Sequence, residues 1–533
     1  MRRYLIALLL LLAACQRETP APPPPAPRAP ANTPRDGGRL QRRLESDVHT
    51  LNYILHTEEE ERQVLAYIYE PLIALDQNLK PVPSIATKWE VSPDRRTYTL
   101  YLDPRATFSD RTPVKASDVV FTINKIVDLS PQFSGWFEGL DRAQTKALDD
   151  RTVRVVFTQP RAAQLQSFNI SVVPEHVYGK GELSKIREVV GNGPYVLERR
   201  ETGRSILIRR RADYWREKPH IESILFRPVT DETAAWNAYM RGQADVGRIN
   251  NDVWWREKDK PAVQQKFVFV SAWLLAYNCF AWNLEDPLFN DVRVRRALAM
   301  SFDRDTVIKE LYYGQARPVS GPFTPDHWAY NHEVQPVAFN PQAAAALLGS
   351  AGWHDSDADG ILDRDGKKFA FTMLIPQGAV AQSQTQIFQD ALRKIGVQMD
   401  IATMEGASFF DRVLNRNFQA AFFSWVLEPD PDRDVYSMFH STQKAPDGLN
   451  VGGYANPEAD ELIEQGRVEF DPARRTEIYH QLHELLARDQ PYLWTVQVAS
   501  KWAVNRRVQN VRASNGTGLF LWEPGPRVWW LKE

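Results

Sequence analysis

The sequence predicts an α/β protein built from several domains. The chain has 533 residues, which is several times the length of an ordinary domain. Residues 369–375 form an apolar run typical of a strand, and residues 397–401 alternate between apolar and polar side chains as a second strand. Between them, four apolar residues recur at helical spacing: Phe388, Ala391, Leu392 and Ile395. A strand–helix–strand unit of this length implies two parallel strands joined by a right-handed crossover.

The N-terminus has the pattern of a secretory signal. Arg2 and Arg3 precede an unbroken apolar run from Leu5 to Ala14, which is too short to span a bilayer. The run ends in Leu-Ala-Ala-Cys, which resembles the bacterial lipobox, in which the cysteine thiol is lipidated. We therefore expect a signal peptide over residues 1–14 and a lipid on Cys15, with a plain signal peptide or an anchor helix as the alternatives.

A proline-rich tether is predicted over residues 15–36. Eight of the fifteen residues from Pro20 to Pro34 are proline, which favours an extended polyproline II conformation. The lipid and the tether together place the folded body in the cell envelope, either in the periplasm or on the outer side of the cytoplasmic membrane. The remaining cysteine, Cys279, has no partner for an internal disulfide, and we expect it to be buried.

The composition excludes one class of partner. The net charge of −2 at pH 7 lacks the basic excess typical of nucleic-acid binding. The apolar fraction of 43% is enough for a full hydrophobic core. No second apolar run is long enough to span a bilayer.

Local patterns predict the elements of the first half of the chain. Residues 58–61 are an acidic first turn, which favours a helix that ends at Pro71. Residues 97–102 alternate as a strand, and Ser117-Asp118 is expected to cap the next helix. Two glycines flank Asn192 and permit positive φ, which predicts a sharp turn.

Two further helices are predicted in the second half. Residues 294–302 carry apolar side chains at helical spacing, and their neighbours Arg293, Arg295 and Arg296 are expected to be solvated or paired with carboxylates. Residues 471–489 form an amphipathic helix that ends before Pro491. Its His480 and His483 have no evident third metal ligand, which favours a surface helix.

Six motifs in a fixed order resemble one protein family. They are Pro83-x-Ile-Ala-x-x-Trp89-x-x-Ser-x-Asp94, Phe108-x-Asp-x-Thr-Pro-x-x-Ala-x-Asp-Val-x-Phe121, Gly191-Asn-Gly-Pro-Tyr195, the segment from Asp231 to Asp245, Asn278 with Pro287 to Leu298, and Asp303-Arg304. Together they resemble the extracytoplasmic solute-binding proteins of family 5, which are the oligopeptide-, dipeptide- and nickel-binding proteins of ABC importers. The resemblance covers roughly residues 38–491, and one departure is Arg111, where the family usually has glycine.

The resemblance implies a fold and a division into domains. The fold would be periplasmic binding protein-like (type II), an α/β architecture with mixed sheets, two lobes joined by a hinge, and three domains. Domain I would be discontinuous, over residues 37–75, 190–269 and 505–533. Domain II would be an insertion over residues 76–189, and domain III would cover residues 270–504.

The resemblance also implies a function. A monomeric lipoprotein of an ABC importer would capture a peptide or peptide-like solute between its lobes and deliver it to a membrane permease with its ATPase. It would be no enzyme and would need no cofactor. The alternatives are a binding protein for a non-peptide solute, such as a metal chelate, an oligosaccharide or an opine-like compound, and an envelope hydrolase.

The candidate site lies on the stretch 422–432. Two prolines stiffen the segment after an apolar strand, so we expect Trp425, Glu428 and Asp430 at the end of that strand, where open α/β sheets bind ligands. The alternatives are an acidic solvent turn and a glycosidase-like carboxylate pair.

In peptide-binding members of the family, an aspartate three residues after a tryptophan pairs with the peptide α-ammonium, and Glu428 has that position here. Phe422 and Phe423 stand where oligopeptide binders carry a basic residue. Trp136 and Glu58 complete the candidate ligand-binding residues.

No metal site is expected. Residues 355–363 match the first nine positions of an EF-hand loop, but position twelve, which needs a bidentate glutamate, is Gly366. Tight Ca²⁺ binding is therefore not expected, and an acidic surface hairpin is the preferred interpretation. The sequence contains no G-x-S-x-G motif, P-loop or dinucleotide-binding glycine pattern.

Overall fold

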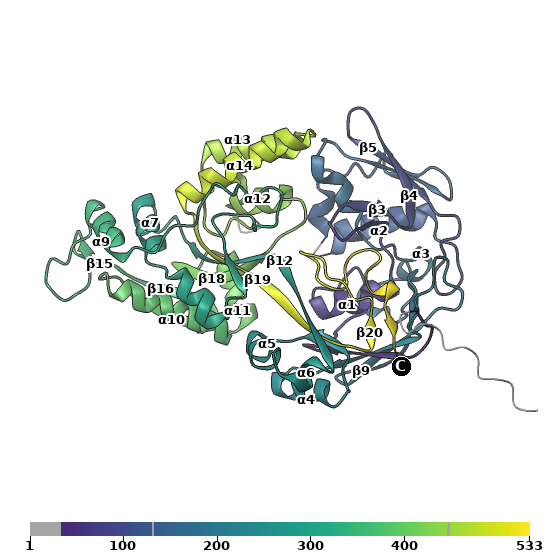
Figure 1. The fold of residues 1–533 in the computed structure, drawn as a ribbon. Helices are drawn as coiled ribbons and strands as arrows, with labels where there is room; N and C mark the ends of the chain where they lie inside the picture. The colour runs from purple at the N-terminus through teal and green to yellow at the C-terminus, as the bar shows by residue number, and fades with distance from the viewer. Residues whose placement is uncertain (1–32, 131–132, 445–447, 533) are drawn as a thin grey trace, which may run out of the picture.

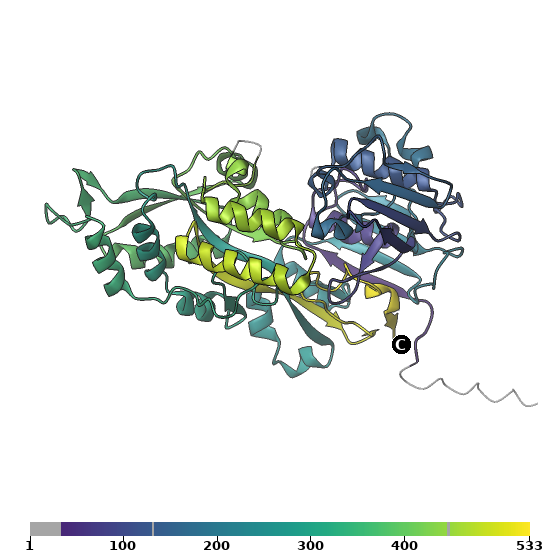
Figure 2. The ribbon, with the colours of Figure 1, turned by 90° about the horizontal axis from the view of Figure 1, so that it is seen from above.

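Two long strands, β12 (Phe267–Trp282) and β19 (Tyr492–Asn505), connect the two lobes of the protein (Figures 1 and 2). The computed structural model describes residues 33–130, 133–444 and 448–532. The first lobe contains the N-terminal half and the C-terminal segment, and the second lobe contains the residues between the two strands. The predicted signal peptide, Cys15 and most of the tether lie outside the described residues.

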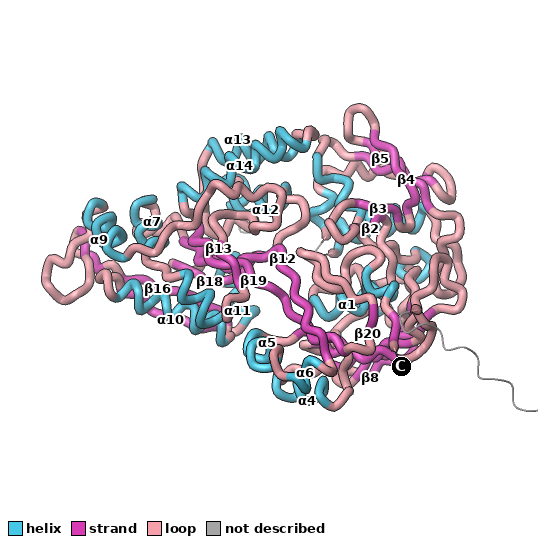
Figure 3. The backbone as a smooth tube through the Cα atoms, in the orientation of Figure 1, coloured by secondary structure: helices cyan, strands magenta, loops and turns pink. Residues whose placement is uncertain are grey.

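One mixed sheet runs through both lobes (Figure 3). Strands β1/β10, β1/β11, β16/β17 and β16/β18 pair in parallel, and the other neighbours are antiparallel. From one edge of the sheet to the other, the strands are β17 (Gln398–Met404), β16 (Ala370–Pro376), β18 (Ala420–Val426), β12, β19, β11 (Val246–Arg248), β1 (Arg39–Leu44), β10 (Ser223–Pro228), β9 (Ser205–Arg210) and β8 (Tyr195–Glu201). Strand β13 (Ala316–Pro318) pairs with β19. The hinge is therefore made of continuous sheet strands.

The predicted strand–helix–strand unit is present in the second lobe. Strands β16 and β17 are parallel, helix α10 (Ala379–Arg393) connects them, and Gly396 ends the connection with a φ of 79°. Helices cover both faces of this sheet. On one face are α7 (Val292–Met300), α9 (Pro341–Ser350) and α10, and on the other are α11 (Gly406–Leu414), α12 (Asp432–Phe439), α13 (Pro457–Val468) and α14 (Pro472–Asp489).

The first four residues of strand β18, 420–423, are buried on both faces of the sheet. Phe422 packs into the core below one face, and Phe423 packs into the core on the other. Cys279 of the neighbouring β12 is buried and has a free thiol, as expected. A strand covered on both faces has a continuous apolar sequence, which explains why this segment lacks the alternation of a half-exposed strand.

A second, antiparallel sheet lies in the first lobe, in the order β4 (Ala86–Val91), β5 (Thr97–Leu102), β7 (Thr152–Val156) and β6 (Lys146–Ala147). The alternation predicted for residues 97–102 is confirmed, because Tyr98, Leu100 and Leu102 are buried. Helix α2 (Ala116–Leu129) packs against this sheet. Ser117-Asp118 is not its cap: Lys115 is the N-cap residue, and Asp118 lies in the first turn, where its Oδ2 accepts a 2.8 Å hydrogen bond from the Lys115 amide.

The shorter elements complete the chain. In the first lobe they are α1 (Glu59–Ile68), β2 (Ile73–Leu75), β3 (Pro81–Pro83), α3 (Glu175–Tyr178), α4 (Glu232–Met240), α5 (Asn251–Glu257), α6 (Pro261–Gln264), β20 (Val508–Gln509), β21 (Trp530–Leu531) and the 3-10 turns η1 (Ser134–Phe137), η2 (Ala162–Phe168), η3 (Leu183–Lys185) and η6 (Gly525–Val528). In the second they are α8 (Arg304–Thr306), the π-helical turn η4 (Val307–Leu311), β14 (Asp363–Arg364), β15 (Lys367–Lys368) and η5 (Ser441–Lys444). Among the described residues, none of the helices combines the length and the apolar character that a membrane crossing needs.

The glycines around Asn192 have a different role from the predicted one. Neither has positive φ. Instead, a Cβ on Gly191 would lie 2.1 Å from the Ile68 carbonyl oxygen, and a Cβ on Gly193 would lie 2.6 Å from the Ile68 carbonyl carbon. The Gly193 amide donates a 2.8 Å hydrogen bond to that oxygen. Glycine is therefore needed for close approach of two backbones, and this contact holds the C-terminal end of α1.

The prediction for Arg295 was wrong. Its guanidinium is buried and donates to four carbonyl oxygens, those of Phe289, Asn290, Asp489 and Gln490, at 2.6–3.1 Å. The side chain thereby ties the end of α14 to the start of α7. A sequence pattern cannot reveal this role, because two of the four partners, the carbonyl oxygens of Asp489 and Gln490, are 194 and 195 residues away.

Arg111 adopts the backbone conformation that glycine favours. Its φ is 72°, and its exposed side chain makes a 3.4 Å ion pair with Asp213. A left-handed conformation costs a non-glycine residue about 1–2 kcal/mol, whereas an exposed ion pair contributes about 0–1 kcal/mol. We expect Arg111→Gly to raise the free energy of unfolding by about 0.5–1 kcal/mol, since the greater freedom of glycine in the unfolded chain offsets part of the gain.

Urea denaturation followed by tryptophan fluorescence measures this change. Arg111→Ala is the matched control, because it removes the same side chain but keeps a Cβ at positive φ, and we expect it to be close to neutral. A gain for alanine equal to that for glycine would show that the side chain, and not the backbone, is the source of the effect.

Candidate binding cleft between the lobes

A cavity of about 550 Å³ lies between the two lobes. The first lobe lines it with the segment from Tyr53 to Pro71, with residues of η1 and η2, and with the C-terminal segment from Gly516 to Arg527. The second lobe contributes Leu275 and the segment from Val426 to Asp430, together with Arg433. Its volume is within the range of about 300–1,000 Å³ that is usual for small-molecule pockets.

The loop after β18 is held in place by backbone hydrogen bonds. The Leu427 amide donates to the Leu275 carbonyl oxygen at 2.7 Å, and the Glu428 amide donates to Asp434 Oδ2 at 2.8 Å. The Asp432 amide donates to Asp430 Oδ1 at 3.1 Å, where α12 begins. With its two prolines, the loop presents Glu428 to the cavity as a fixed group.

Glu428 lacks a full counter-charge. Its side chain is 37% exposed, and the nearest cation is Arg433, with Nη1 at 4.0 Å from Oε1. Burial raises the pKa of Glu428, while Arg433 and Arg62 lower it. Burial and the charge of Glu428 raise the pKa of the neighbouring Asp434 well above its usual value. Two carboxyl groups therefore lie beside one guanidinium, and their surplus negative charge is relieved by a shared proton or by an additional cation.

Asp430 already has a counter-ion from the protein. Arg475 of α14 binds it through both ends of its guanidinium, at 2.6 and 2.7 Å, and both side chains are almost fully buried. Next to it, burial and the charge of Asp430 raise the pKa of Asp432 to about 7, and Arg467 lies 3.0 Å from its Oδ1. Asp430 lines the cavity, but its charge is neutralised from behind.

The structure brings together four of the five predicted ligand-binding residues. Glu58, Trp136, Glu428 and Asp430 all line the cavity. Trp425 is not among the lining residues, because the pleat turns its ring away to pack edge-on against Phe423 at 5.3 Å. Contact of each of these residues with a ligand stays a prediction.

The lobes also touch beside the cavity. Arg467 of the second lobe forms a 3.1 Å ion pair with Glu138 of the first, and the Arg433 guanidinium lies 5.6 Å from the centre of the Trp136 ring. The structure is thus a closed arrangement, in which the walls of the cavity come from both sides of the hinge.

Sequence reasoning missed the C-terminal wall of the cavity. Glu70 is buried and lies 3.3 Å from both Arg216 and Arg527, and Arg527 also pairs with Glu523. Tyr214 donates a 2.5 Å hydrogen bond to Glu70. The charges alone could have flagged these residues, but no local pattern shows that positions 70, 214 and 527 meet.

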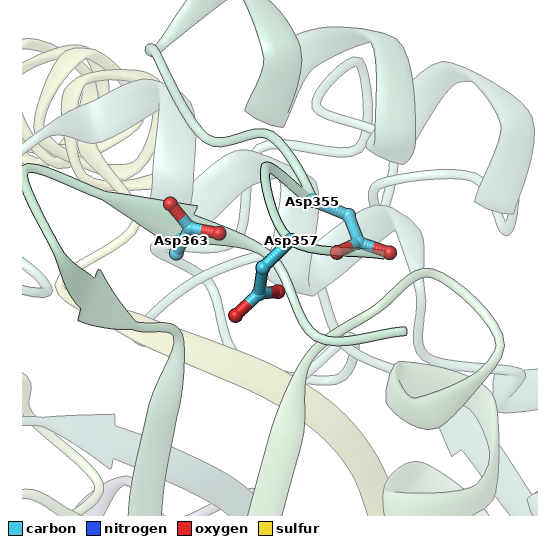
Figure 4. A group of neighbouring side chains, drawn as sticks. All are labelled: Asp355, Asp357 and Asp363. Carbon is cyan, nitrogen blue, oxygen red and sulfur yellow. The ribbon is translucent and has the colours of Figure 1, made fainter. Parts of the chain in front are cut away.

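The acidic hairpin gathers several carboxylates away from the cavity. Asp355, Asp357 and Asp363 gather at one loop (Figure 4). The Lys368 ammonium lies 2.6 Å from Asp357, 2.9 Å from Asp359 and 3.7 Å from Asp363. A cation of the protein itself therefore neutralises part of the negative charge of this loop.

The prediction of a surface position for the histidines was wrong for His483. It is fully buried, its Nδ1 accepts from the Asn331 amide, and its Nε2 lies 3.0 Å from Ser320 Oγ. Burial lowers its pKa to about 3, so the ring is neutral and acts as a structural hydrogen-bonding group.

The family comparison decides the protein class. A family model described as bacterial extracellular solute-binding proteins, family 5 (middle region), matches residues 80–446. The chain belongs to this family. The predicted fold class is confirmed by solved structures, and the members of the family act outside the cytoplasm.

Relatives in this family have low identity but overlap with most of the chain. The oligopeptide-binding protein AppA of Bacillus subtilis is 25% identical over 552 residues, covering 99% of this chain and 98% of AppA. The dipeptide-binding protein of Escherichia coli is 26% identical, covering 77% of this chain and 80% of that protein.

Two solved structures show the same fold. AppA in complex with a nonapeptide superposes with a TM-score of 0.79 at 24% identity, covering 94% of this chain and 100% of that chain. NikA of Brucella suis in complex with Fe(III)-EDTA superposes with a TM-score of 0.81 at 23% identity, covering 90% and 98%. Proteins of this fold therefore hold chemically different solutes.

Proposed function

We propose that this family 5 protein is the solute-binding component of an ABC importer and that it captures a peptide by its free α-ammonium at Glu428. The carrying observation is the corner in which Glu428 and Asp434 share the guanidinium of Arg433 beside an interlobe cavity. An ammonium group in that corner would neutralise the surplus carboxylate, which is costly to bury alone. The names of the relatives that bind oligopeptides and dipeptides support the same class of solute.

The proposal extends to the setting of the protein. A lipid on Cys15 and the proline-rich tether would hold a monomer at the membrane surface, where the closed form meets a permease and its ATPase. Ligand would favour the closed form through its higher affinity for that form. The Glu138–Arg467 ion pair is one contact that forms between the lobes in the closed arrangement.

Two measurements on the wild-type protein test the proposed solute. Mass spectrometry of small molecules released from gently denatured protein identifies what co-purifies, and we expect amine-bearing peptide-like compounds. Calorimetry then compares tri-alanine with N-acetyl-tri-alanine, and we expect the acetylated peptide to bind at least tenfold more weakly, a difference of about 1.4 kcal/mol.

Other outcomes would contradict the proposal. Equal affinity for the two peptides would exclude recognition of the amine. A co-purified metal chelate or oligosaccharide would favour a non-peptide solute, and turnover of the peptide would favour an envelope hydrolase.

A further inference from the structure

Each basic side chain among the described residues that line the cavity lies near a carboxylate of the protein. Among the described lining residues these groups are three arginines, Arg62, Arg433 and Arg527, and no lysine. Arg62 donates to Glu59 Oε2 through Nε at 2.9 Å and through Nη2 at 2.5 Å. Arg527 serves both Glu70 and Glu523.

Arg433 is shared rather than free. It is the guanidinium nearest Glu428, and its charge lowers the pKa of both Glu428 and Asp434. Its Nη1 is covered by protein, although it has no hydrogen-bond partner among the described residues. A ligand carboxylate at this guanidinium would compete with two carboxylates of the protein itself.

The remaining candidate, His56, does not offer a cation either. It lines the cavity but is almost fully buried, and burial lowers its pKa. Its Nδ1 lies 2.6 Å from the Tyr53 carbonyl oxygen, so Nδ1 carries the proton and Nε2 is an acceptor. A neutral ring in this tautomer cannot donate from Nε2 to a carboxylate.

The same wall is rich in carboxylates. In the part of the chain that the structure describes, six carboxylate side chains line the cavity: Glu58, Glu59, Glu70, Glu428, Asp430 and Glu523. A free carboxylate of the ligand inside this cavity would lose its water without gaining a counter-ion that is not already close to a carboxylate of the protein. The charges of the cavity therefore favour the ammonium end of a zwitterionic peptide over its carboxylate end.

We infer that the cleft recognises its ligand through the amine alone and takes peptide-like amines that place no free carboxylate inside the cavity. The ligand class is thus a cationic amine whose carboxyl end is amidated or otherwise uncharged, or lies outside the cavity. This inference rests on the proposed function, because it assumes that the amine binds at Glu428.

Calorimetry with matched peptides tests the inference. On the wild-type protein, tri-alanine amide is expected to bind roughly tenfold more tightly than tri-alanine, in keeping with 1.4 kcal/mol for each factor of ten. Hexa-alanine and its amide are the second pair. A difference that persists with length means that the carboxyl end stays in the cavity, and a ratio near one means that it has left the cavity.

Two variants examine the arginines that a carboxylate would use. Arg62→Gln and Arg433→Gln are each expected to keep the preference for the amide. Selective loss of the acid, with the amide unchanged, would reveal a carboxylate clamp and overturn the inference, as would tighter binding of tri-alanine than of its amide by the wild type. Thermal melting checks that both variants fold.

These outcomes are separate from those of the proposed function. A preference for the acid over the amide overturns only the present inference. Equal binding of free and N-acetylated peptide overturns the amine site and the inference with it. Absence of binding by all of these peptides overturns both.

Discussion

Asp430→Asn is expected to lower the free energy of unfolding by about 3–5 kcal/mol, the usual cost of breaking a buried ion pair by removing one charge. The substitution keeps the shape of the side chain but leaves the buried Arg475 guanidinium without its two charged hydrogen bonds, now at 2.6 and 2.7 Å. The loop that carries Glu428 leads into α12 next to this ion pair. Loss of the pair should therefore disturb the position of Glu428 and lower the affinity for peptide as well. Urea denaturation followed by tryptophan fluorescence measures the change.

A double-mutant cycle tests whether the pair acts as a unit. We expect Arg475→Gln to cost a similar amount and the double variant Asp430→Asn/Arg475→Gln to cost less than the sum, because the two residues are in direct contact. Asp390→Asn is the control: it breaks the ion pair with Arg393, in which both side chains are exposed, and should cost less than about 1 kcal/mol. A loss for Asp430→Asn no larger than this control would show that the pair is unimportant.

Glu428→Gln is expected to weaken the binding of tri-alanine by about 2–3 kcal/mol, or roughly 30- to 150-fold. The amide keeps the size and hydrogen-bonding capacity of the side chain but removes the charge that would pair with the ammonium. N-acetyl-tri-alanine should bind the variant and the wild type with similar affinity. Calorimetry with both peptides measures the four dissociation constants.

The control for this variant is Glu477→Gln on the exposed face of α14. It changes the net charge of the same lobe by the same amount without touching the cavity. We expect no change in the affinity for tri-alanine. An equal loss of free and acetylated peptide in Glu428→Gln would remove Glu428 as the partner of the amine.

The binding of tri-alanine should also depend on pH. The charged form of Glu428 binds the ammonium, and burial raises the pKa of this group in the free protein. Affinity is therefore expected to fall as the pH decreases through the raised pKa, which happens at a higher pH than for an ordinary glutamate. The peptide ammonium stays protonated throughout this window, since α-amino groups titrate near 7.7–8.0. In Glu428→Gln this loss should be largely absent, and an unchanged pH profile would contradict the assignment.

Local patterns predicted those parts of the fold that depend on neighbours in the sequence. The strand at residues 97–102 and the β16–α10–β17 unit were predicted from the spacing of apolar residues. That spacing shows whether an element is buried on one face or on both. The glycine pair around Asn192 was found for the wrong reason, because close approach to Ile68 looks the same in sequence as a positive φ. His483 was misplaced because its charged helix neighbours conceal a buried contact with Ser320.

The candidate site divides in the same way. Trp425, Glu428 and Asp430 were all predicted from one stretch, but the pleat of β18 and the position of Arg475 give them different environments. Trp425 packs on Phe423, and the charge of Asp430 is neutralised by Arg475, which is 45 residues away in the sequence. Of the three, only Glu428 has an incomplete counter-charge. Nothing within the stretch itself distinguishes these three outcomes.

The sequence by itself determined the family, the strand that carries the site and the charge of Glu428. Motifs, the spacing of apolar residues and ionisable groups can all be recognised from short stretches of sequence. Only the tertiary structure decided which carboxylates of the cleft are already paired. That property depends on arginines brought from distant parts of the chain, and the energy of a buried charge is set by the atoms around it rather than by its neighbours in sequence.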